Sequence, residues 1–382
     1  MKAPRPGSFL LLVCTTMIAQ GQEGAQWGNM IFRPDVSLTA AHDSRAITLP
    51  DNTYDEDFYM EAAAGLSIQN LPAKYNLSGR GIFGVRYYDD NQGNLSHFYN
   101  LVAAIGVTNE DALQWGLSAD VARTLDYSTS YDPDTGQRPD PILTDEESTR
   151  FTAEGHIGYD QRLTDKMSLL PAYSLRHYHQ EFQTAEPAEW QTHQASLQLR
   201  RRQSEKIIYT LGGYYTLQDN DDENGYIGTL MLGMEGRLSE KTTWLAEGGY
   251  AMADYEISGS DQGFVSNFQA TWQATEKIST YVFGGTDFVP GYDTSPATWV
   301  YRLGYGAGWQ IIEKLGLQGS VVHDYREEIG NGGASDKDRL FADISARYSF
   351  TGRLYAGLGA RYVKDEKEPN QLVYSIVAGY TY

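Results

Sequence analysis

The chain has little cysteine, no long apolar run and few positive charges, and each of these absences excludes a class of protein or site. Its 382 residues include one cysteine, Cys14, so disulfide bonds and thiolate metal sites are excluded from the rest of the chain. No apolar run approaches the roughly 20 residues that a membrane-spanning helix needs, which excludes a helical membrane protein. Positive charge is scarce, with 30 Lys and Arg against 50 Asp and Glu. Such a balance repels phosphate backbones, so we expect no nucleic-acid partner.

Glycine and aromatic residues are abundant instead. The chain has 39 Gly and 28 Tyr, and 41% of its residues are hydrophobic. This apolar content is too high for an intrinsically disordered chain, so the sequence predicts a folded protein.

The first residues have the pattern of an export signal. Lys2 and Arg5 precede the apolar run 9–19, and small residues follow at Ala19 and Gly21. We therefore expect a signal peptide over residues 1–21 and a single domain over 22–382. A lipoprotein signal at Cys14 is the less favoured alternative, because Val13 stands where a small residue is wanted.

The rest of the chain alternates apolar and polar residues with a period of two, which is the period of a β-strand. For example, Leu113, Trp115 and Leu117 share one face, while Gln114 and Ser118 share the other. Eighteen segments show this pattern, and the weakest is 189–202, where Gln and Arg interrupt the apolar face.

Every second connection between these segments is a tight turn. Four of the turns carry a hydroxyl residue, an acid and a lysine, and they lie at 164–166, 204–206, 239–241 and 275–277. A fifth copy, at 312–314, lacks the hydroxyl residue. The other connections are longer and acidic, among them 43–57, 128–147 and 219–224. Short turns at one end and long loops at the other are typical of outer-membrane barrels.

These patterns predict an all-β fold: a closed antiparallel transmembrane β-barrel of about 18 strands, with 16 as the fallback. In lipid every backbone polar group must be paired, so strands can span only as a closed ring. Aromatic residues near strand ends are candidates for the two interfacial girdles. They are Tyr75, Tyr87, Tyr159, Trp190, Tyr209, Tyr215, Trp244, Trp272, Trp299, Trp309, Tyr362 and Tyr380.

The last strand carries a second signal. Apolar residues alternate along it up to an aromatic terminal residue, as in the insertion signal that the barrel-assembly machinery reads. The residues of this signal are Tyr374, Ile376, Ala378, Tyr380 and Tyr382.

One short stretch resembles a known family. The sequence 31–38 (IFRPDVSL), followed by His42, Asp43 and Ser44, resembles the first strand and loop of the β-barrel porin 2 family. His42 and Arg45 stand where Tyr and Asn are more usual, so the match is partial. The resemblance implies an outer-membrane barrel, and it permits a role in exopolysaccharide export because some members are associated with that process.

The polar faces of the strands carry charges of both signs. We expect a hydrated lumen whose charged side chains select solutes; a salt-bridged, filled interior is the alternative. The residues expected to set selectivity are Arg80, Arg86, Arg150, Glu154, Arg176, Glu235, Arg237, Arg302, Asp343, Arg347 and Arg361. Further lumen positions are Glu61, Asp120, Glu247, Asp287, Asp324, Tyr178, Tyr214, Tyr281 and Tyr355.

No pattern indicates enzyme chemistry, and we predict no catalytic residue, no metal site and no cofactor. His156 beside Glu154 resembles a general base, but no serine is visibly paired with it and no Gly-x-Ser-x-Gly elbow occurs. We interpret His177 and His179 as an interfacial pair, since no third metal ligand is evident. Acidic loop clusters at 51–57, 132–140 and 219–223 lack the EF-hand spacing and are read as solvated loop tips.

The favoured function is passive diffusion of small hydrophilic solutes, with mild cation preference if the loop acids surround the mouth. An accessory of exopolysaccharide export and a structural or adhesive barrel are the alternatives. The expected partners are outer-membrane lipid and lipopolysaccharide, the barrel-assembly machinery, and a small solute or polysaccharide in the lumen. Whether loop 128–147 enters the pore is left open.

Overall fold

The computed structural model is all-β and describes residues 25–48, 54–71, 75–88, 95–107, 113–124, 148–182, 187–220, 223–290, 297–328, 337–365 and 370–381. The predicted signal peptide 1–21, the loop 128–147, the cluster 132–140 and Tyr382 lie outside these ranges. Among the described residues, no helix is long and apolar enough to cross a membrane.

Twenty strands are assigned. Their bounds are β1 Ala25–Trp27, β2 Met30–Thr48, β3 Tyr54–Asn70, β4 Tyr75–Tyr88, β5 Leu95–Val107, β6 Leu113–Thr124, β7 Ser148–Tyr159, β8 Gln161–Thr164, β9 Met167–Phe182, β10 Ala188–Arg202, β11 Ile207–Asn220, β12 Gly225–Ser239, β13 Thr242–Tyr255, β14 Gly259–Thr275, β15 Ile278–Pro290, β16 Ala297–Ile312, β17 Leu315–Glu328, β18 Lys337–Ser349, β19 Leu354–Asp365 and β20 Gln371–Thr381. The short β1 and β8 pair only with β2 and β9, which leaves eighteen strands in the wall of the barrel.

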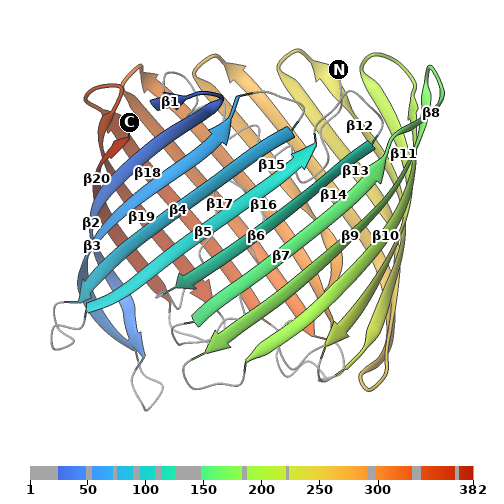
Figure 1. Cartoon of the computed structure of the whole chain (residues 1–382), viewed down its shortest axis with the longest axis horizontal. Helices are drawn as coiled ribbons and strands as arrows, with labels where there is room; N and C mark the ends of the chain where they lie inside the picture. Colours follow the sequence, from blue (N-terminus) through green and yellow to red (C-terminus); the bar gives the residue numbers. More distant parts are fainter. Residues whose placement is uncertain are drawn as a thin grey trace.

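The wall closes between the first and last of these strands. β2 pairs antiparallel with β20 from Asp35–Thr381 to Asp43–Val373, so no edge strand is left open. Figure 1 shows the strands tilted around a single barrel, with the tight turns at its upper rim. The predicted closed antiparallel barrel of eighteen strands is confirmed.

The tight turns explain the repeated hydroxyl–acid–lysine motif. In four turns the lysine N–H donates to the hydroxyl oxygen two residues earlier, as in Lys206 to Ser204 at 3.2 Å. Such a side-chain bond closes the turn locally. Thr351 and Arg353 form a fifth turn of this kind, which the motif search missed because Gly352 and Arg353 replace the acid and the lysine.

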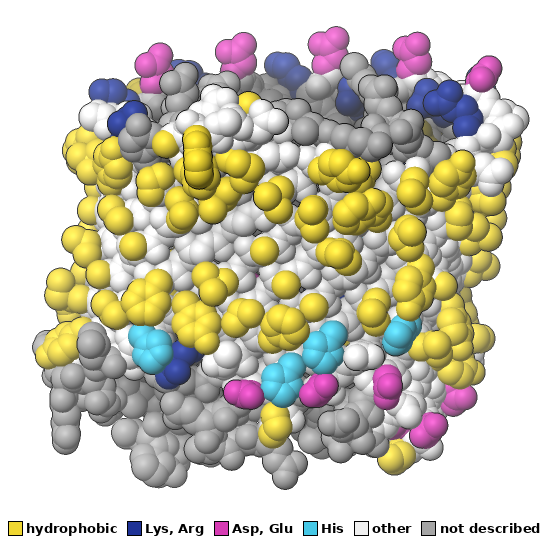
Figure 2. Space-filling model, in the orientation of Figure 1, with side chains coloured by type: hydrophobic (Ala, Val, Ile, Leu, Met, Phe, Trp, Pro, Cys, Tyr) yellow, Lys and Arg dark blue, Asp and Glu magenta, His cyan; other side chains and the backbone are white. Residues whose placement is uncertain are grey.

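Side chains alternate between the two faces of the wall, and the outward face is apolar. Large apolar residues on it are exposed, including Leu38, Leu232 and Ile376 at 60–66%. Figure 2 shows apolar side chains as a band across the visible face of the barrel, with charged residues at its upper rim and His and acidic residues along its lower edge. An exposed apolar band on a closed barrel fits a lipid bilayer.

The girdle prediction is wrong at two positions. Trp190 and Trp299 are 3% and 6% exposed and cannot face lipid. Trp190 stacks on Tyr178 with ring centroids 4.8 Å apart. Trp299 packs edge-on against Phe288 with centroids 4.6 Å apart. Trp190 lies on the inward face of β10 opposite Tyr178, and Trp299 fills a gap beside Gly263 on β14.

Candidate functional site

The lumen is the candidate site, and the strict alternation of the strands determines which residues line it. The register pairs Glu61 with Arg86, Glu154 with Arg176 and Asp343 with Arg361, all on the face opposite the exposed apolar residues. By the same alternation, all the predicted lumen residues point inward.

The loop-side half of the lumen holds a layer of ion pairs between neighbouring strands. Their N–O distances are 2.8 Å for Arg86–Glu61, 3.0 Å for Arg150–Asp120, 4.0 Å for Arg176–Glu154 and 2.7 Å for Arg361–Asp343. The Arg86 guanidinium also lies 4.2 Å from the centre of the Tyr59 ring. These contacts hold the charged side chains against the wall.

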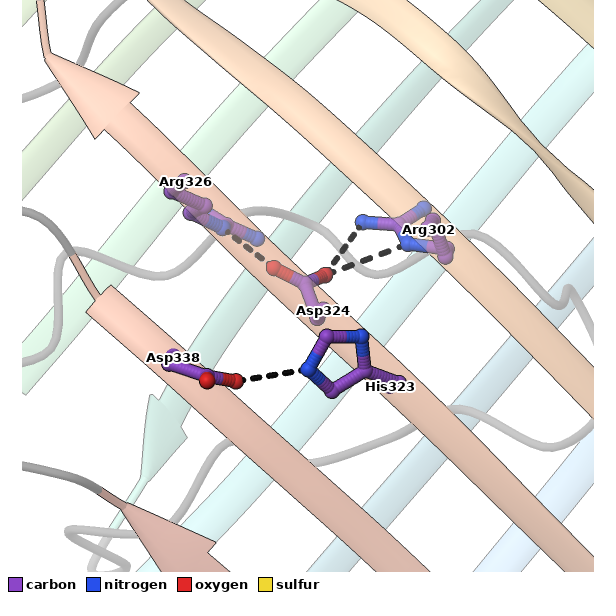
Figure 3. A network of polar contacts seen from close by, with 5 residues as sticks. All are labelled: Arg302, His323, Asp324, Arg326 and Asp338. Atoms are coloured by element: carbon purple, nitrogen blue, oxygen red, sulfur yellow. Dashed lines mark hydrogen bonds and ion pairs between the residues drawn. The ribbon is translucent and has the colours of Figure 1, made fainter.

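The most buried of these groups is Asp324 on β17, at 1% exposure. It accepts hydrogen bonds from Arg302 on β16 and Arg326 on β17, each at 2.9 Å (Figure 3). The next residue, His323, points to the other face and lies 2.7 Å from Asp338 on β18. A carboxylate shared by two guanidiniums has its lone pairs satisfied despite its burial.

Inward side chains become buried toward the loop-side ends of the strands. They come from every part of the wall and include polar and charged groups. The set comprises Asp43, Asp57, Arg86, Tyr88, Tyr178, Gln180, Trp190, Gln218, Tyr255, Asp324, Arg339, Phe341, Val363 and Gln371. The lumen is therefore narrowest toward this end.

Near the middle of the wall the lumen is open. Val102, Ser118, Gln194 and Ser345 point inward and are nevertheless exposed, so space for water lies beside them. Ser118, Gln194 and Ser345 are polar.

Several inward aromatic rings lie over glycines of the neighbouring strand. Tyr281 and Phe283 on β15 cover Gly306 and Gly304 on β16, where an added Cβ would overlap the rings. In the same way Tyr355 covers Gly379. The abundance of Gly and Tyr thus has a structural reason, since a glycine opposite an inward ring gives that ring a place beside the backbone.

The histidines divide between the two faces. His156 points inward near Gly116, and its neighbour Glu154 pairs with Arg176. His177 and His179 point outward on β9; His179 contacts Glu181 and Glu189 at 3.4 and 3.2 Å, and His177 lies against Phe151. No group of three or more potential metal ligands occurs among the described residues.

The last strand presents the predicted insertion residues to the outside. Tyr374, Ile376 and Tyr380 are 54%, 60% and 38% exposed, and Ala378 shares their face. Whether assembly machinery reads this strand stays a prediction.

Comparison with known proteins gives structural similarity at low identity. No family model matches the chain, and no curated protein matches it. The FrpB iron transporter of Neisseria meningitidis, F5-1 variant in its apoprotein form, is 12% identical with a TM-score of 0.49, over 87% of this chain and 61% of that chain. OccAB4 of Acinetobacter baumannii is 9% identical with a TM-score of 0.48, over 92% and 98%. Outer membrane protein opdK of Pseudomonas aeruginosa is 11% identical with a TM-score of 0.47, over 92% and 98%.

This chain spans about three fifths of the length of the FrpB structures. Scores and identities this low carry no argument about function. The resemblance to the β-barrel porin 2 family stays a prediction.

Proposed function

We propose that this chain is an outer-membrane channel of the porin type, through which small hydrophilic solutes diffuse passively. The observation that carries the proposal is the open middle of the lumen, where inward polar side chains such as Ser118, Gln194 and Ser345 are exposed. A lumen with exposed polar side chains holds water, and a barrel of 16–18 strands is wide enough for an aqueous path.

The rest of the proposal follows from the sequence. Residues 1–21 direct export, and the last strand, ending at Tyr382, directs insertion by the barrel-assembly machinery. Lipopolysaccharide and outer-membrane lipid surround the apolar band. Fractionation of inner and outer membranes tests the location, and recovery in the inner-membrane fraction would contradict it.

The test of conduction is single-channel recording of the refolded protein in a planar bilayer. Folding is first established by the resistance of the barrel to SDS without heating. Steady, nearly ohmic current steps are expected. A soluble polymer small enough to enter the narrow loop-side zone should reduce the size of the steps, whereas a polymer too large to enter it should not. Folded protein that gives no steps would reject the channel.

A barrel with a filled interior is the second candidate. The buried inward residues at the loop-side end, such as Asp57, Tyr178 and Gln371, favour it because they close off part of the cross-section. In that case the chain acts as a structural or adhesive surface, and the same recordings decide between the two candidates. No observation specifically favours an exopolysaccharide role.

A further inference from the structure

Five arginines surround the turn-side mouth of the lumen. Each points inward and lies within three residues of the turn-side end of its strand: Arg33 on β2, Arg200 and Arg202 on β10, Arg237 on β12 and Arg347 on β18. At this level no acidic side chain of the described strands points inward. The described strands therefore line the mouth with charge of one sign.

These arginines differ from those deeper in the lumen. Arg86, Arg150, Arg176 and Arg361 each pair with a carboxylate of a neighbouring strand. None of the five at the mouth forms an ion pair within the described chain, and Arg347 instead lies 3.7 Å from the centre of the Tyr355 ring.

Two of the five have an unmet hydrogen-bond donor. The Nε atoms of Arg33 and Arg200 are shielded from solvent and find no acceptor within the described residues. A shielded donor without an acceptor is unfavourable, and a guanidinium that turns toward an oxyanion in the mouth would gain an acceptor. Arg202, Arg237 and Arg347 are exposed and free to turn toward it.

Acidic groups stand one level deeper and at the turn tips. Asp35, Glu235 and Glu247 point inward four or five residues from the turns. The tips themselves carry both signs, as the mixed colours along the upper rim of Figure 2 show. The deeper acids lie further from the turns than the five arginines, so positive charge comes first at the mouth.

The arginines also approach the mouth from two sides. Arg200, Arg202 and Arg237 lie on β10 and β12, while Arg33 and Arg347 lie on β2 and β18. The two groups of arginines are separated by β13–β17 in one direction around the barrel and by β3–β7 and β9 in the other. The two groups therefore lie on nearly opposite walls.

We propose that this ring of Arg33, Arg200, Arg202, Arg237 and Arg347 collects small anionic solutes, carrying carboxylate or phosphate groups, at the turn-side mouth of the channel. The proposal rests on the proposed function and adds the substrate class to it. Guanidinium groups suit both oxyanions because they donate in a planar, two-pronged geometry. Convergent positive charge at the entrance of a low-dielectric passage raises the local concentration of anions.

The test compares two sets of substitutions on neighbouring residues. The triple variant Arg200→Gln, Arg202→Gln, Arg237→Gln removes three charges from the mouth. The control Arg201→Gln removes one from the outward face of the same strand, at the same height. Reversal potentials are measured in a KCl gradient at low ionic strength, where screening is weak.

The triple variant should lower the chloride-to-potassium permeability ratio by about twofold or more, because three lumen charges are lost. The control should leave the ratio unchanged. Inorganic phosphate added on the turn side should reduce the chloride current of the wild type more strongly than that of the triple variant. An unchanged ratio in the triple variant, or an equal change in the control, would overturn the proposal.

A second readout separates this proposal from the channel function. If the folded barrel does not conduct, the line width of the ³¹P NMR signal of inorganic phosphate is measured with each protein. Broadening by the wild type and the Arg201→Gln control, but not by the triple variant, supports the anion ring even though the channel is rejected. Equal line widths for all three would reject the ring as well.

Discussion

Trp299 on β16 donates its indole N–H to the Asp261 carboxylate on β14, at 2.7 Å, across the intervening strand β15. The contact exists because β14 and β15 separate near the loops. Their pairing ends at Ser266–Thr286, while β15 and β16 stay paired as far as Pro290–Ala297. The Trp299 ring fills the resulting wedge against Gly263.

Replacing Trp299 by phenylalanine tests what this contact contributes. The ring would still fill much of the wedge, but Asp261 would lose a donor, so we expect a loss of about 1–2 kcal/mol in the free energy of unfolding. Urea denaturation in detergent micelles measures it. Trp309→Phe is the matched control, because Trp309 is 48% exposed on the outward face and should change the free energy by much less. Equal losses in the two variants would contradict the interpretation.

The two ion-pair systems of Figure 3 should differ in their effect on stability. Asp324→Asn leaves Arg302 and Arg326 without their shared carboxylate in a buried place, and we expect a loss of about 3 kcal/mol. Asp338→Asn on the next strand breaks a pair with His323 whose side chains are about half exposed, so solvent screening should limit the loss to about 1 kcal/mol or less. Urea denaturation of both variants checks the order, and a larger loss for Asp338→Asn would contradict it.

Much of the barrel could be predicted because alternation with period two is local. Glu61 and Arg86 both fall on polar faces, and that is readable without a structure. Their pairing across β3 and β4 is not readable, because it depends on register, which the turns fix. Trp299 was misplaced because the rule of alternating faces assumes that neighbouring strands stay paired, and β14 and β15 do not.

Only part of the arginine ring could be predicted from the sequence. Arg237 and Arg347 were predicted to line the lumen, whereas Arg33, Arg200 and Arg202 were not. Strand β10 was the weakest segment because Gln and Arg seemed to interrupt its apolar face. Gln194, Gln198, Arg200 and Arg202 instead continue the inward face, and reading the polar positions at period two would have found them.

Enlarging a glycine beneath an inward ring should narrow the channel. A Cβ at Gly306 would overlap the Tyr281 ring, so Gly306→Val must push that ring away from the wall and toward the lumen. We expect smaller single-channel conductance with an unchanged fold. Gly213→Val is the control, since Gly213 faces outward on β11 with no atom near its added Cβ. Conductance that falls equally in the control would show that the effect comes from general distortion of the wall.

Glu223 links two loop-side connections through hydrogen bonds, and its contribution to the stability of the fold should depend on pH. The carboxylate precedes β12 and accepts hydrogen bonds from the backbone N–H groups of Ile257 and Ser258 and, at 2.7 Å, from the Ser258 hydroxyl. Burial raises the pKa of Glu223, but these bonds lower it by more, so the pKa lies below its ordinary value of 4.5.

A carboxyl group with a lowered pKa stabilises the fold in its ionised form. Its contribution is complete above about pH 4.5 and disappears as the pH falls through the lower value of the folded state. The melting temperature of Glu223→Gln should therefore be below that of the wild type at pH 7, and the difference should shrink below about pH 4. Glu256→Gln, at an exposed neighbouring position, serves as the control and should melt like the wild type at every pH. A difference for Glu223→Gln that stays constant down to pH 3 would mean that the amide, and not the lost charge, causes the destabilisation.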